Sequence, residues 1–381
     1  MAEIADMRMA ELAGGGMTER AREKTHPVMV GSVQVGGGAP VSVQSMCTTK
    51  TTDVTATLAQ IKTLTDAGCE IIRVAIPDAH ALAGFEEICQ KSPLPVVADI
   101  HFDHRLAIEA AHLGASALRI NPGNIGSWER VDAVIEAAQK AHIPIRIGVN
   151  AGSLAKEFDT RPDMTLTEKL VASASSFVTH FHARGFDDIV LSAKAHDVPT
   201  TLAVYRALSR ELPRIPLHVG VTEAGTLRQG TVKNATAVGI LLEQGIGDTM
   251  RLSLTADPVE EVHVAWELLA ALGMRRNKPE LVSCPTCGRC GVNMIPIAEK
   301  VSKRLEDVHV PISVAVMGCV VNGPGEARGV DIGVACGKGS AVLFEKGVPT
   351  KKIAEKDIVD ELFGEIEARF VKKPDDEDKN T

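Results

Sequence analysis

Short aliphatic runs that end on polar residues alternate with amphipathic stretches along most of the chain. The runs cover residues 41–46, 70–77, 95–100, 117–122, 144–149, 188–193, 216–222 and 249–254. Helical periodicity fills the intervals, for example at 55–67, 104–113, 128–141, 166–184 and 201–212. Eight strand and helix units in succession predict a (β/α)₈ TIM barrel. A Rossmann sheet would need Gly-x-Gly-x-x-Gly after its first strand, where this sequence has none.

The pattern changes after the eighth unit. A helix at 258–272 closes the barrel, and Arg-Arg-Asn-Lys-Pro at 275–279 is a linker. Beyond it we expect a small α+β domain with strands at 312–317, 330–335 and 341–345 and helices at 295–305 and 357–370. The predicted boundaries are a flexible leader at 1–24, the barrel at 25–274, the small domain at 280–370 and a solvated tail at 371–381.

Composition narrows the class of protein. Aromatic residues make up 3% of the 381 positions, so the core must consist of small and branched aliphatic side chains, as in parallel α/β proteins. The net charge of −8 argues against a broad nucleic-acid surface. With no apolar run of about 18 residues and no secretory leader, we expect a soluble, cytoplasmic protein. Its eight cysteines are then reduced thiols rather than disulfides.

Four of those cysteines lie in two segments of the small domain. Residues 284–290 read Cys-Pro-Thr-Cys-Gly-Arg-Cys, and residues 318–326 read Gly-Cys-Val-Val-Asn-Gly-Pro-Gly-Glu. Two thiolates three positions apart can bind one metal centre, and Cys319 can supply the next ligand. The spacing leaves zinc and iron–sulfur open, although a zinc ribbon usually repeats the Cys-x-x-Cys pair. Three thiolates and an oxygen ligand such as Glu326 suit a cluster with one labile iron, and Cys290 is the ambiguous fourth thiol.

Cationic residues recur where the predicted strands end, at the face that carries active sites in barrel enzymes. They are Arg73, Arg119, Arg146, Lys194 and Arg251. Five cations at one face repel one another unless an anion neutralises them, and guanidinium groups match phosphate oxygens. The Asn- and Gly-containing loops at 121–126 and 150–153 offer backbone N–H groups for the same purpose. The alternative is that each arginine pairs with an internal carboxylate such as Asp99 or Glu223; the pattern favours a ligand with more than one phosphate.

Acids and imidazoles at the same strand ends are less decisive. Asp99 and His101 alternate along a strand, so both face the barrel interior or its mouth as candidate general acids or as partners of an arginine. Glu223, just past the seventh strand, is the best-placed proton donor. We expect His218, in mid-strand, to be a hydrogen-bonded core histidine. The remaining cysteines have structural interpretations: Cys47, Cys69, Cys89 and Cys336.

Several longer segments match one known family over about residues 25–370. They are Val-Gln-Ser-Met at 43–46, Ala-Asp-Ile-His-Phe-Asp at 98–103, Leu-Arg-Ile-Asn-Pro-Gly-Asn-Ile-Gly at 118–126, Ile-Arg-Ile-Gly-Val-Asn-Ala-Gly-Ser at 145–153, Val-Thr-Glu-Ala-Gly at 221–225, residues 243–249, Ala-Asp-Pro-Val-Glu-Glu at 256–261, Cys-Pro-Thr-Cys at 284–287 and Gly-Cys-Val-Val-Asn-Gly-Pro-Gly-Glu-Ala at 318–327. Through these segments the chain resembles the bacterial hydroxymethylbutenyl diphosphate synthase family of the non-mevalonate isoprenoid pathway.

The resemblance implies an oxidoreductase that opens the ring of 2-C-methyl-D-erythritol 2,4-cyclodiphosphate by two-electron reduction with loss of water. The product would be 4-hydroxy-3-methylbut-2-enyl diphosphate. It also implies a [4Fe–4S] cluster in the small domain, held by Cys284, Cys287, Cys319 and Glu326. A glutamate is weakly held, so that substrate oxygen can replace it. Cys290 departs from the family pattern, and we favour Glu326 as the fourth ligand because Gly-Pro-Gly at 323–325 presents it.

The same resemblance assigns the substrate contacts and the partners. Glu223 and Glu326 are the implied catalytic residues, with Glu223 as proton donor to the leaving hydroxyl. The family is a homodimer in which the cluster domain of one subunit caps the barrel of the other, and reduced flavodoxin or ferredoxin supplies the electrons. The implied diphosphate-binding residues are Arg73, Arg119, Arg146, Lys194, Arg251 and Ser253, with Asn150 and Asn322 beside the substrate.

Two other classes of enzyme compete with this interpretation. A structural zinc module on a phosphate-binding barrel would make an aldolase-like or isomerase-like enzyme without redox chemistry. A radical S-adenosylmethionine enzyme would be expected to show Cys-x-x-x-Cys-x-x-Cys, whereas the spacing here is Cys-x-x-Cys-x-x-Cys.

Overall fold

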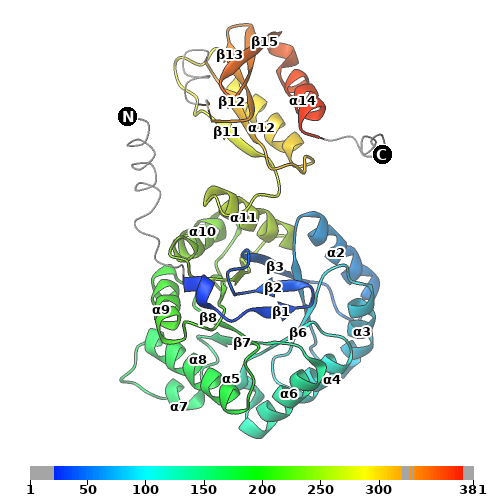
Figure 1. Cartoon of the computed structure of the whole chain (residues 1–381), viewed down its shortest axis with the longest axis vertical. Coiled ribbons are helices and arrows are strands. Elements are labelled where there is room, and N and C mark those ends of the chain that lie inside the picture. Colours follow the sequence, from blue (N-terminus) through cyan, green and yellow to red (C-terminus); the bar gives the residue numbers. More distant parts are fainter. Residues whose placement is uncertain (1–20, 320–326, 328, 372–381) are drawn as a thin grey trace, which may run out of the picture. The chain divides into compact units, whose positions relative to one another are not determined.

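The computed structural model describes residues 21–319, 327 and 329–371. The chain divides into two compact units, Met1–Met274 and Arg275–Thr381 (Figure 1). Residues 1–20 of the predicted leader and 372–381 of the predicted tail lie outside the described residues. The described end of the leader forms a 3₁₀ helix, η1 (Ala21–Lys24), in which the Arg22 N–H donates to the Gly245 carbonyl at 3.0 Å. This hydrogen bond attaches the four residues to the barrel.

Eight parallel strands form the barrel of the first unit, in the order β8-β7-β6-β5-β4-β3-β10-β9. A bridge between Leu191 and Leu217 joins the two ends of this sheet. The predicted (β/α)₈ barrel is confirmed, and each strand overlaps the aliphatic run that predicted it. The strands are β3 (Ser42–Met46), β4 (Ile71–Ala75), β5 (Val96–Asp99), β6 (Ala117–Ile120), β7 (Ile145–Asn150), β8 (Ile189–Lys194), β9 (His218–Val219) and β10 (Thr249–Met250).

Helices surround these strands (Figure 1) and bury Val, Ile, Leu and Ala against them. Side chains at their N-termini fix where they begin: Asp53 accepts from the Ala56 N–H, and Thr165 forms a capping box with Glu168. None of the described helices is long and apolar enough to cross a bilayer. The helices are α2 (Val54–Asp66), η2 (Ala79–Ala81), α3 (Leu82–Lys91), α4 (His104–His112), α5 (Pro122–Ile125), α6 (Trp128–Ala141), α7 (Lys156–Asp159), α8 (Leu166–Ala183), α9 (Val198–Glu211), α10 (Leu227–Glu243) and α11 (Pro258–Ala271).

An antiparallel hairpin that the sequence pattern did not predict covers the amino-terminal end of the barrel (Figure 1). Its strands are β1 (Val28–Val30) and β2 (Val33–Val35). They are three residues long, too short to give a recognisable period of two. The buried valines of the hairpin pack on residues at the starts of the barrel strands, namely Ile71, Val97, Ala117 and Val190. The hairpin therefore seals this end, and the carboxyl ends of the strands remain for a ligand.

Asp248 lies just before β10, and its surroundings predict that the free energy of unfolding depends on pH. It is 3% exposed, with Oδ2 accepting from the Leu217 N–H at 2.7 Å and Oδ1 accepting from the Thr25 hydroxyl at 2.9 Å. Burial raises its pKa from 3.8 to about 6, against the opposing effect of these hydrogen bonds. An acid with a raised pKa in the folded chain loses stability as pH rises through the interval between the two values.

We therefore expect the free energy of unfolding, relative to that of Asp248→Asn, to fall by about 2–3 kcal/mol as pH rises from about 4 to about 7. Urea unfolding of both chains across this range measures the difference. Parallel pH profiles for the two chains would contradict it.

The second unit is a mixed five-stranded sheet in the order β11-β12-β13-β14-β15, parallel from β11 to β13 and antiparallel thereafter. Its strands are β11 (Glu280–Ser283), β12 (Ser313–Met317), β13 (Ile332–Gly337), β14 (Ser340–Glu345) and β15 (Val348–Ala354), and its helices are α12 (Met294–Leu305), η3 (Glu355–Asp357) and α14 (Ile358–Arg369). Residues of α12 and α14 share one hydrophobic core with β12, β13 and β14. The predicted α+β class is confirmed. The prediction missed β11 and β15, because β11 is only half-buried and β15 is mostly exposed.

Candidate functional site

The five predicted cations form one electrostatic cluster inside the barrel. Arg119, Arg146 and Lys194 are 7%, 5% and 8% exposed, and Arg73 and Arg251 are partly buried. The pKa of Lys194 is well below its ordinary value, first because of burial and then because of the charges of the four arginines. Such a cluster is unfavourable unless counter-charges are close.

Asp99, the last residue of β5, is one counter-charge. Its Oδ2 lies 3.3 Å from Arg73 Nε, and its Oδ1 accepts from Arg119 Nη1 at 3.0 Å. Burial would raise the pKa of this carboxyl, but Arg73, the side chain of His101 and further arginines together hold it well below its usual range. His101 lies beyond the strand, about half exposed, with Nε2 3.6 Å from Asp99 Oδ2. Asp99 is therefore an ionised anchor for two arginines, and this interpretation suits it better than that of a general acid.

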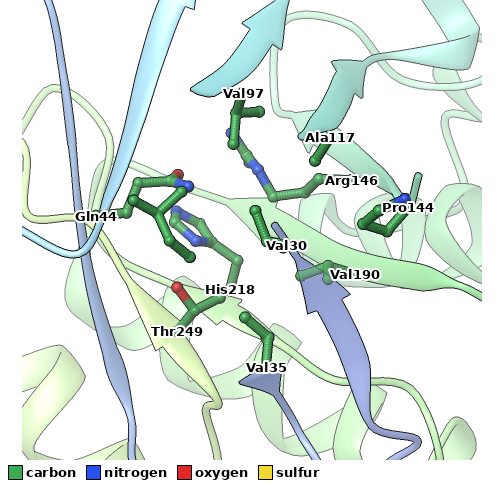
Figure 2. A pocket seen from close by; sticks show the side chains of 11 residues that line it. Val30, Val35, Gln44, Val97, Ala117, Pro144, Arg146, Val190, His218 and Thr249 are labelled. Carbon is green, nitrogen blue, oxygen red and sulfur yellow. The ribbon is translucent and has the colours of Figure 1, made fainter. Parts of the chain in front are cut away.

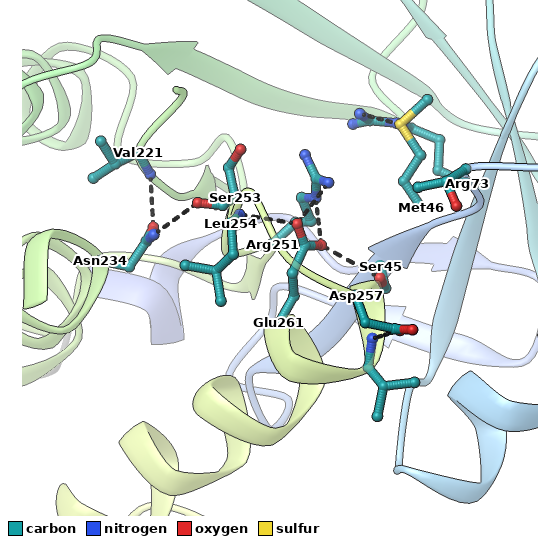
Figure 3. A network of polar contacts seen from close by, with 12 residues as sticks. Ser45, Met46, Arg73, Val221, Asn234, Arg251, Ser253, Leu254, Asp257 and Glu261 are labelled. Atoms are coloured by element: carbon teal, nitrogen blue, oxygen red, sulfur yellow. Dashed lines mark hydrogen bonds and ion pairs between the residues drawn. The ribbon is translucent and has the colours of Figure 1, made fainter. Parts of the chain in front are cut away.

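Glu261 on α11 is the second counter-charge, and the sequence prediction missed it (Figure 3). Arg251 donates to it through both Nε, at 3.0 Å, and Nη2, at 2.8 Å. Glu261 also accepts from the Leu254 N–H at 3.1 Å and from the Ser45 hydroxyl at 3.4 Å. The signal was present in the helix pattern, because this acid occupies the buried stripe of α11 between Pro258 and Ala265.

Arg146 and Lys194 have no carboxylate partner among the described residues. Arg146 donates through Nη1 to Ser192 Oγ at 2.9 Å, while its Nε and Nη2 are buried without a partner from the described part of the chain. Among the described residues, five cations thus face two carboxylates, Asp99 and Glu261. The alternative that each arginine pairs with an internal carboxylate finds no such partner for Arg146 in this part of the chain. The excess positive charge and the free N–H groups suit a ligand that carries at least two negative charges.

Two glycines allow the cations to lie against the strands. A Cβ at Gly148 would lie 2.6 Å from Arg119 Nε. A Cβ at Gly220 would lie 2.3 Å from the Arg251 carbonyl and 2.9 Å from Lys194 Nζ. No larger residue fits at either position without moving a cation or the backbone.

We expect Gly148→Ala to weaken the affinity of the barrel for inorganic diphosphate by about 10- to 100-fold, because the Arg119 guanidinium must leave its place beside Asp99. Titration calorimetry measures the affinity. Gly364→Ala is the matched control, since a Cβ there meets nothing within 4 Å. Equal affinities for the two variants would contradict the expectation.

The loops at the carboxyl ends of the strands carry the other predicted site residues. Asn150 is the last residue of β7. Asn121, which follows β6, donates from Nδ2 to the carbonyl of Ser153 at 2.9 Å and so joins the loops after β6 and β7. Buried Asn234 accepts from the Val221 N–H at 3.2 Å and donates to the Ser253 carbonyl at 3.3 Å, which joins the loops after β9 and β10 (Figure 3). The sequence prediction did not include Asn234.

Glu223, the predicted proton donor, is exposed in the loop after β9. Its backbone has φ of 51°, in the left-handed region that is costly for a residue with a Cβ. Such strain is common at functional positions. Asn322 and Glu326, also predicted as site residues, lie outside the described residues.

His218 lies inside the barrel, where the sequence predicted a core histidine. It is buried in β9 as predicted, but neither ring nitrogen has a partner among the described residues. Burial, followed by the charges of Lys194 and Arg146, lowers its pKa well below 6.5, so the ring is neutral. The expected hydrogen bond of this core histidine therefore has no protein partner among the described residues. Partners inside a barrel depend on strand register, which the sequence pattern does not give.

The thiol segments of the second unit follow two adjacent parallel strands. Cys284 follows β11, and Gly318 and Cys319 follow β12. Parallel neighbours bring their carboxyl ends to the same edge of a sheet, so the two segments meet there. The Gly291 N–H donates to the Gly318 carbonyl at 3.1 Å and joins them directly.

Gly318 lies beside the thiols of Cys284 and Cys290. Its N–H donates to Cys284 Sγ at 3.1 Å, and a Cβ on it would lie 2.6 Å from Cys290 Sγ and 3.4 Å from Cys284 Sγ. Cys287 is exposed, and the N–H of Arg289 lowers its pKa. No three candidate ligands among the described residues are gathered as a metal site. The donors nevertheless fit a thiolate-bound metal, because backbone N–H groups to sulfur stabilise thiolates.

The other four cysteines were predicted to be structural, and their surroundings are consistent with that role. Burial raises the pKa of each thiol to about 12, which removes thiolate character: Cys47, Cys69, Cys89 and Cys336.

Comparisons with known proteins agree with the division of the chain into a barrel and a smaller second unit. The family model described as the GcpE TIM-barrel domain matches residues 25–266, and the one described as the GcpE protein C-terminal domain matches residues 280–368. A relative from Geobacter sulfurreducens named 4-hydroxy-3-methylbut-2-en-1-yl diphosphate synthase (flavodoxin) is 51% identical over 92% of this chain and 99% of its own length. A relative of the same name from Clostridium acetobutylicum is 53% identical over 91% and 99%. Among solved structures, a dihydropteroate synthase from Coxiella burnetii has a TM-score of 0.49 and 11% identity, covering 65% of this chain and 98% of that one.

Proposed function

Because the chain belongs to the GcpE family, we propose that it performs the reaction after which its relatives are named. It is an oxidoreductase that converts 2-C-methyl-D-erythritol 2,4-cyclodiphosphate to 4-hydroxy-3-methylbut-2-en-1-yl diphosphate in the non-mevalonate pathway. Two electrons and one proton are consumed, one water is released, and the diphosphate gains one negative charge. The observation that carries this proposal for the chain itself is the buried cluster of five cations against two carboxylates, in a chain that also carries the paired thiol segments.

The barrel cations bind the diphosphate. Arg146 and Lys194 are free to do so directly, while Arg73, Arg119 and Arg251 contribute from positions fixed by Asp99 and Glu261. Ser253 and Asn150 lie on the loops around this site, and we assign Asn322 to it as well. Ring opening frees a phosphate oxygen and adds one negative charge. The excess positive charge therefore stabilises the opening ring more than the closed substrate, which favours bond cleavage.

Glu223 donates the proton that the leaving hydroxyl needs. Its place in the loop after β9 and its strained backbone support this role. A carboxylic acid at the exposed mouth can be reprotonated from solvent after each turnover.

A [4Fe–4S] cluster in the second unit is the proposed cofactor. Cys284, Cys287 and Cys319 supply three thiolates, and Glu326 supplies an exchangeable oxygen ligand. Thiolates from adjacent strand ends and the N–H group of Gly318 fit such a centre. When bound, it supplies the electrons for reduction, one at a time.

The proposed partners follow from the family. The name of the relatives supports reduced flavodoxin as electron donor, and ferredoxin would serve if its potential is similar. We also propose a homodimer, in which the cluster domain of one subunit completes the barrel site of the other. A cytoplasmic location fits a reduced thiolate centre.

Anaerobic turnover tests the proposal. The purified chain, with reduced flavodoxin and the cyclodiphosphate, should form the linear hydroxymethylbutenyl diphosphate, detected by mass spectrometry. Arg146→Ala should reduce kcat/KM by about 10- to 100-fold, because one charged phosphate contact is lost. Absence of product from a chain with full iron and sulfide content would overturn the proposal.

Cys290 gives a second prediction. Since Glu326 is the proposed fourth ligand, Cys290→Ser should keep the full iron content and at least about half of the turnover. Iron analysis and the anaerobic assay measure both. If Cys290→Ser loses iron and activity together, Cys290 is a ligand and the assignment of Glu326 fails.

A further inference from the structure

The barrel contains a small cavity between the hairpin and the cation cluster (Figure 2). Its volume is about 20 Å³. One side is apolar, with Val30 and Val35 of the hairpin and Val190 of β8. The other side is polar, with Gln44, Arg146 and His218 among its lining residues.

Each of these three polar side chains has buried atoms without a partner among the described residues. They are Oε1 of Gln44, both ring nitrogens of His218, and Nε and Nη2 of Arg146. Gln44 and Arg146 are 5% exposed, and His218 is fully buried. Nearly all buried polar groups in native proteins are paired, so three such side chains on one cavity indicate a shared partner.

We propose that this cavity is a binding site for one water molecule, hydrogen-bonded to Gln44, His218 and Arg146. A water needs roughly 10–15 Å³ of such space, so the cavity holds one water and excludes a phosphate or a carboxylate ligand. The water accepts from Arg146, donates to Gln44 Oε1 and uses its remaining hydrogen or lone pair with His218. The neutral imidazole suits either bond, because one ring nitrogen donates and the other accepts, and the water contacts one of the two.

The water has a consequence for Arg146. Ser192 accepts from Nη1 at 2.9 Å and holds one end of the guanidinium. The water accepts from one of the two unpaired nitrogens, Nε or Nη2, and leaves the other for the diphosphate. Gln44 and His218 are therefore positioning residues that act on Arg146 through the water. This consequence rests on the proposed function, in which Arg146 binds the diphosphate, whereas the water site does not.

The variant Val190→Ile tests the effect of removing the water without changing the residues that bind it. The added methylene enters the cavity from its apolar side and changes no polar group. Val134→Ile is the matched control, because Val134 on α6 is fully buried but does not line the cavity. The readouts are high-resolution crystal structures, thermal unfolding, and KM and kcat for the cyclodiphosphate.

We expect wild-type density for one atom within hydrogen-bonding distance of Gln44, His218 and Arg146, and its loss in Val190→Ile. That variant should have a lower Tm than Val134→Ile and a KM raised about 5- to 10-fold, with kcat changed by less than about twofold, since a displaced ordered water leaves its partners unpaired. His218→Leu should raise KM similarly, and His218→Gln should restore it.

Three results would overturn the water site. They are an empty wild-type cavity, a Val190→Ile chain with raised Tm and unchanged KM, and an anomalous peak at this position after a bromide soak, which would identify a halide. If the density disappears in Val190→Ile while KM stays unchanged, the assignment of the water site holds, but its action through Arg146 is refuted. Failure of the proposed function appears instead as absence of turnover in the wild-type chain.

Discussion

Replacing Cys284 with serine is expected to remove the proposed metal centre and to lower turnover by more than about a thousandfold, since in the proposed function this cofactor performs the reduction. Cys284 follows β11 directly, and its sulfur accepts from the Gly318 N–H at 3.1 Å. A serine hydroxyl stays protonated at neutral pH and is a poor ligand for iron. Iron and sulfide analysis, together with the anaerobic assay, measures the loss.

Cys89→Ala is the matched control for this prediction. Cys89 lies on α3 in the barrel, where burial raises the pKa of its thiol to about 12. This variant should retain the metal and the activity. If Cys284→Ser retains the same iron content as Cys89→Ala, Cys284 is not a ligand.

Replacing Asp99 with asparagine is expected to lower the free energy of unfolding by about 3–5 kcal/mol, because Arg73 and Arg119 lose their buried counter-charge. The carboxylate contacts both guanidinium groups, at 3.3 and 3.0 Å, and is 1% exposed. Urea unfolding measures the change. Inorganic diphosphate should stabilise the variant more than the wild type, because the variant has the larger excess of positive charge.

Asp66→Asn makes the same substitution in an exposed ion pair. Lys62 lies 2.7 Å from Asp66, whose side chain is 62% exposed, so this change should cost no more than about 0.5 kcal/mol. If Asp99→Asn and Asp66→Asn are destabilised equally, Asp99 does not stabilise the arginines.

The barrel was predictable because each of its strands is buried on both faces and is therefore a continuous aliphatic run. The hairpin β1–β2 was not, since its three-residue strands give no period. In the second unit, strand β15 is mostly exposed, so its sequence is not a run of apolar residues that would predict a strand. Sequence patterns thus identify what is buried, and miss elements that are short or solvated.

Four cations of the site were predictable from one rule, that strand ends in a barrel carry polar residues toward one face. The fifth, Arg146, is the second residue of β7 and lines the cavity beside the hairpin, so the rule does not account for it. The partners of the cations were not predictable. Glu261 comes from a helix distant in sequence, and the free nitrogens of His218 depend on the register of neighbouring strands. The meeting of the two thiol segments likewise depends on the pairing of β11 with β12, which the pattern of residues does not specify.

Redox chemistry at a thiolate-bound cluster distinguishes the proposed enzyme from a phosphate-binding barrel with a structural zinc module. An anaerobic absorption and EPR spectrum of the purified chain, with iron and sulfide analysis, before and after addition of the cyclodiphosphate, tests this point most directly. Broad absorption in the visible range and an EPR signal of the reduced protein that changes with substrate are the expected results. A colourless protein that contains zinc when isolated without oxygen would contradict the redox function and leave a diphosphate-binding barrel.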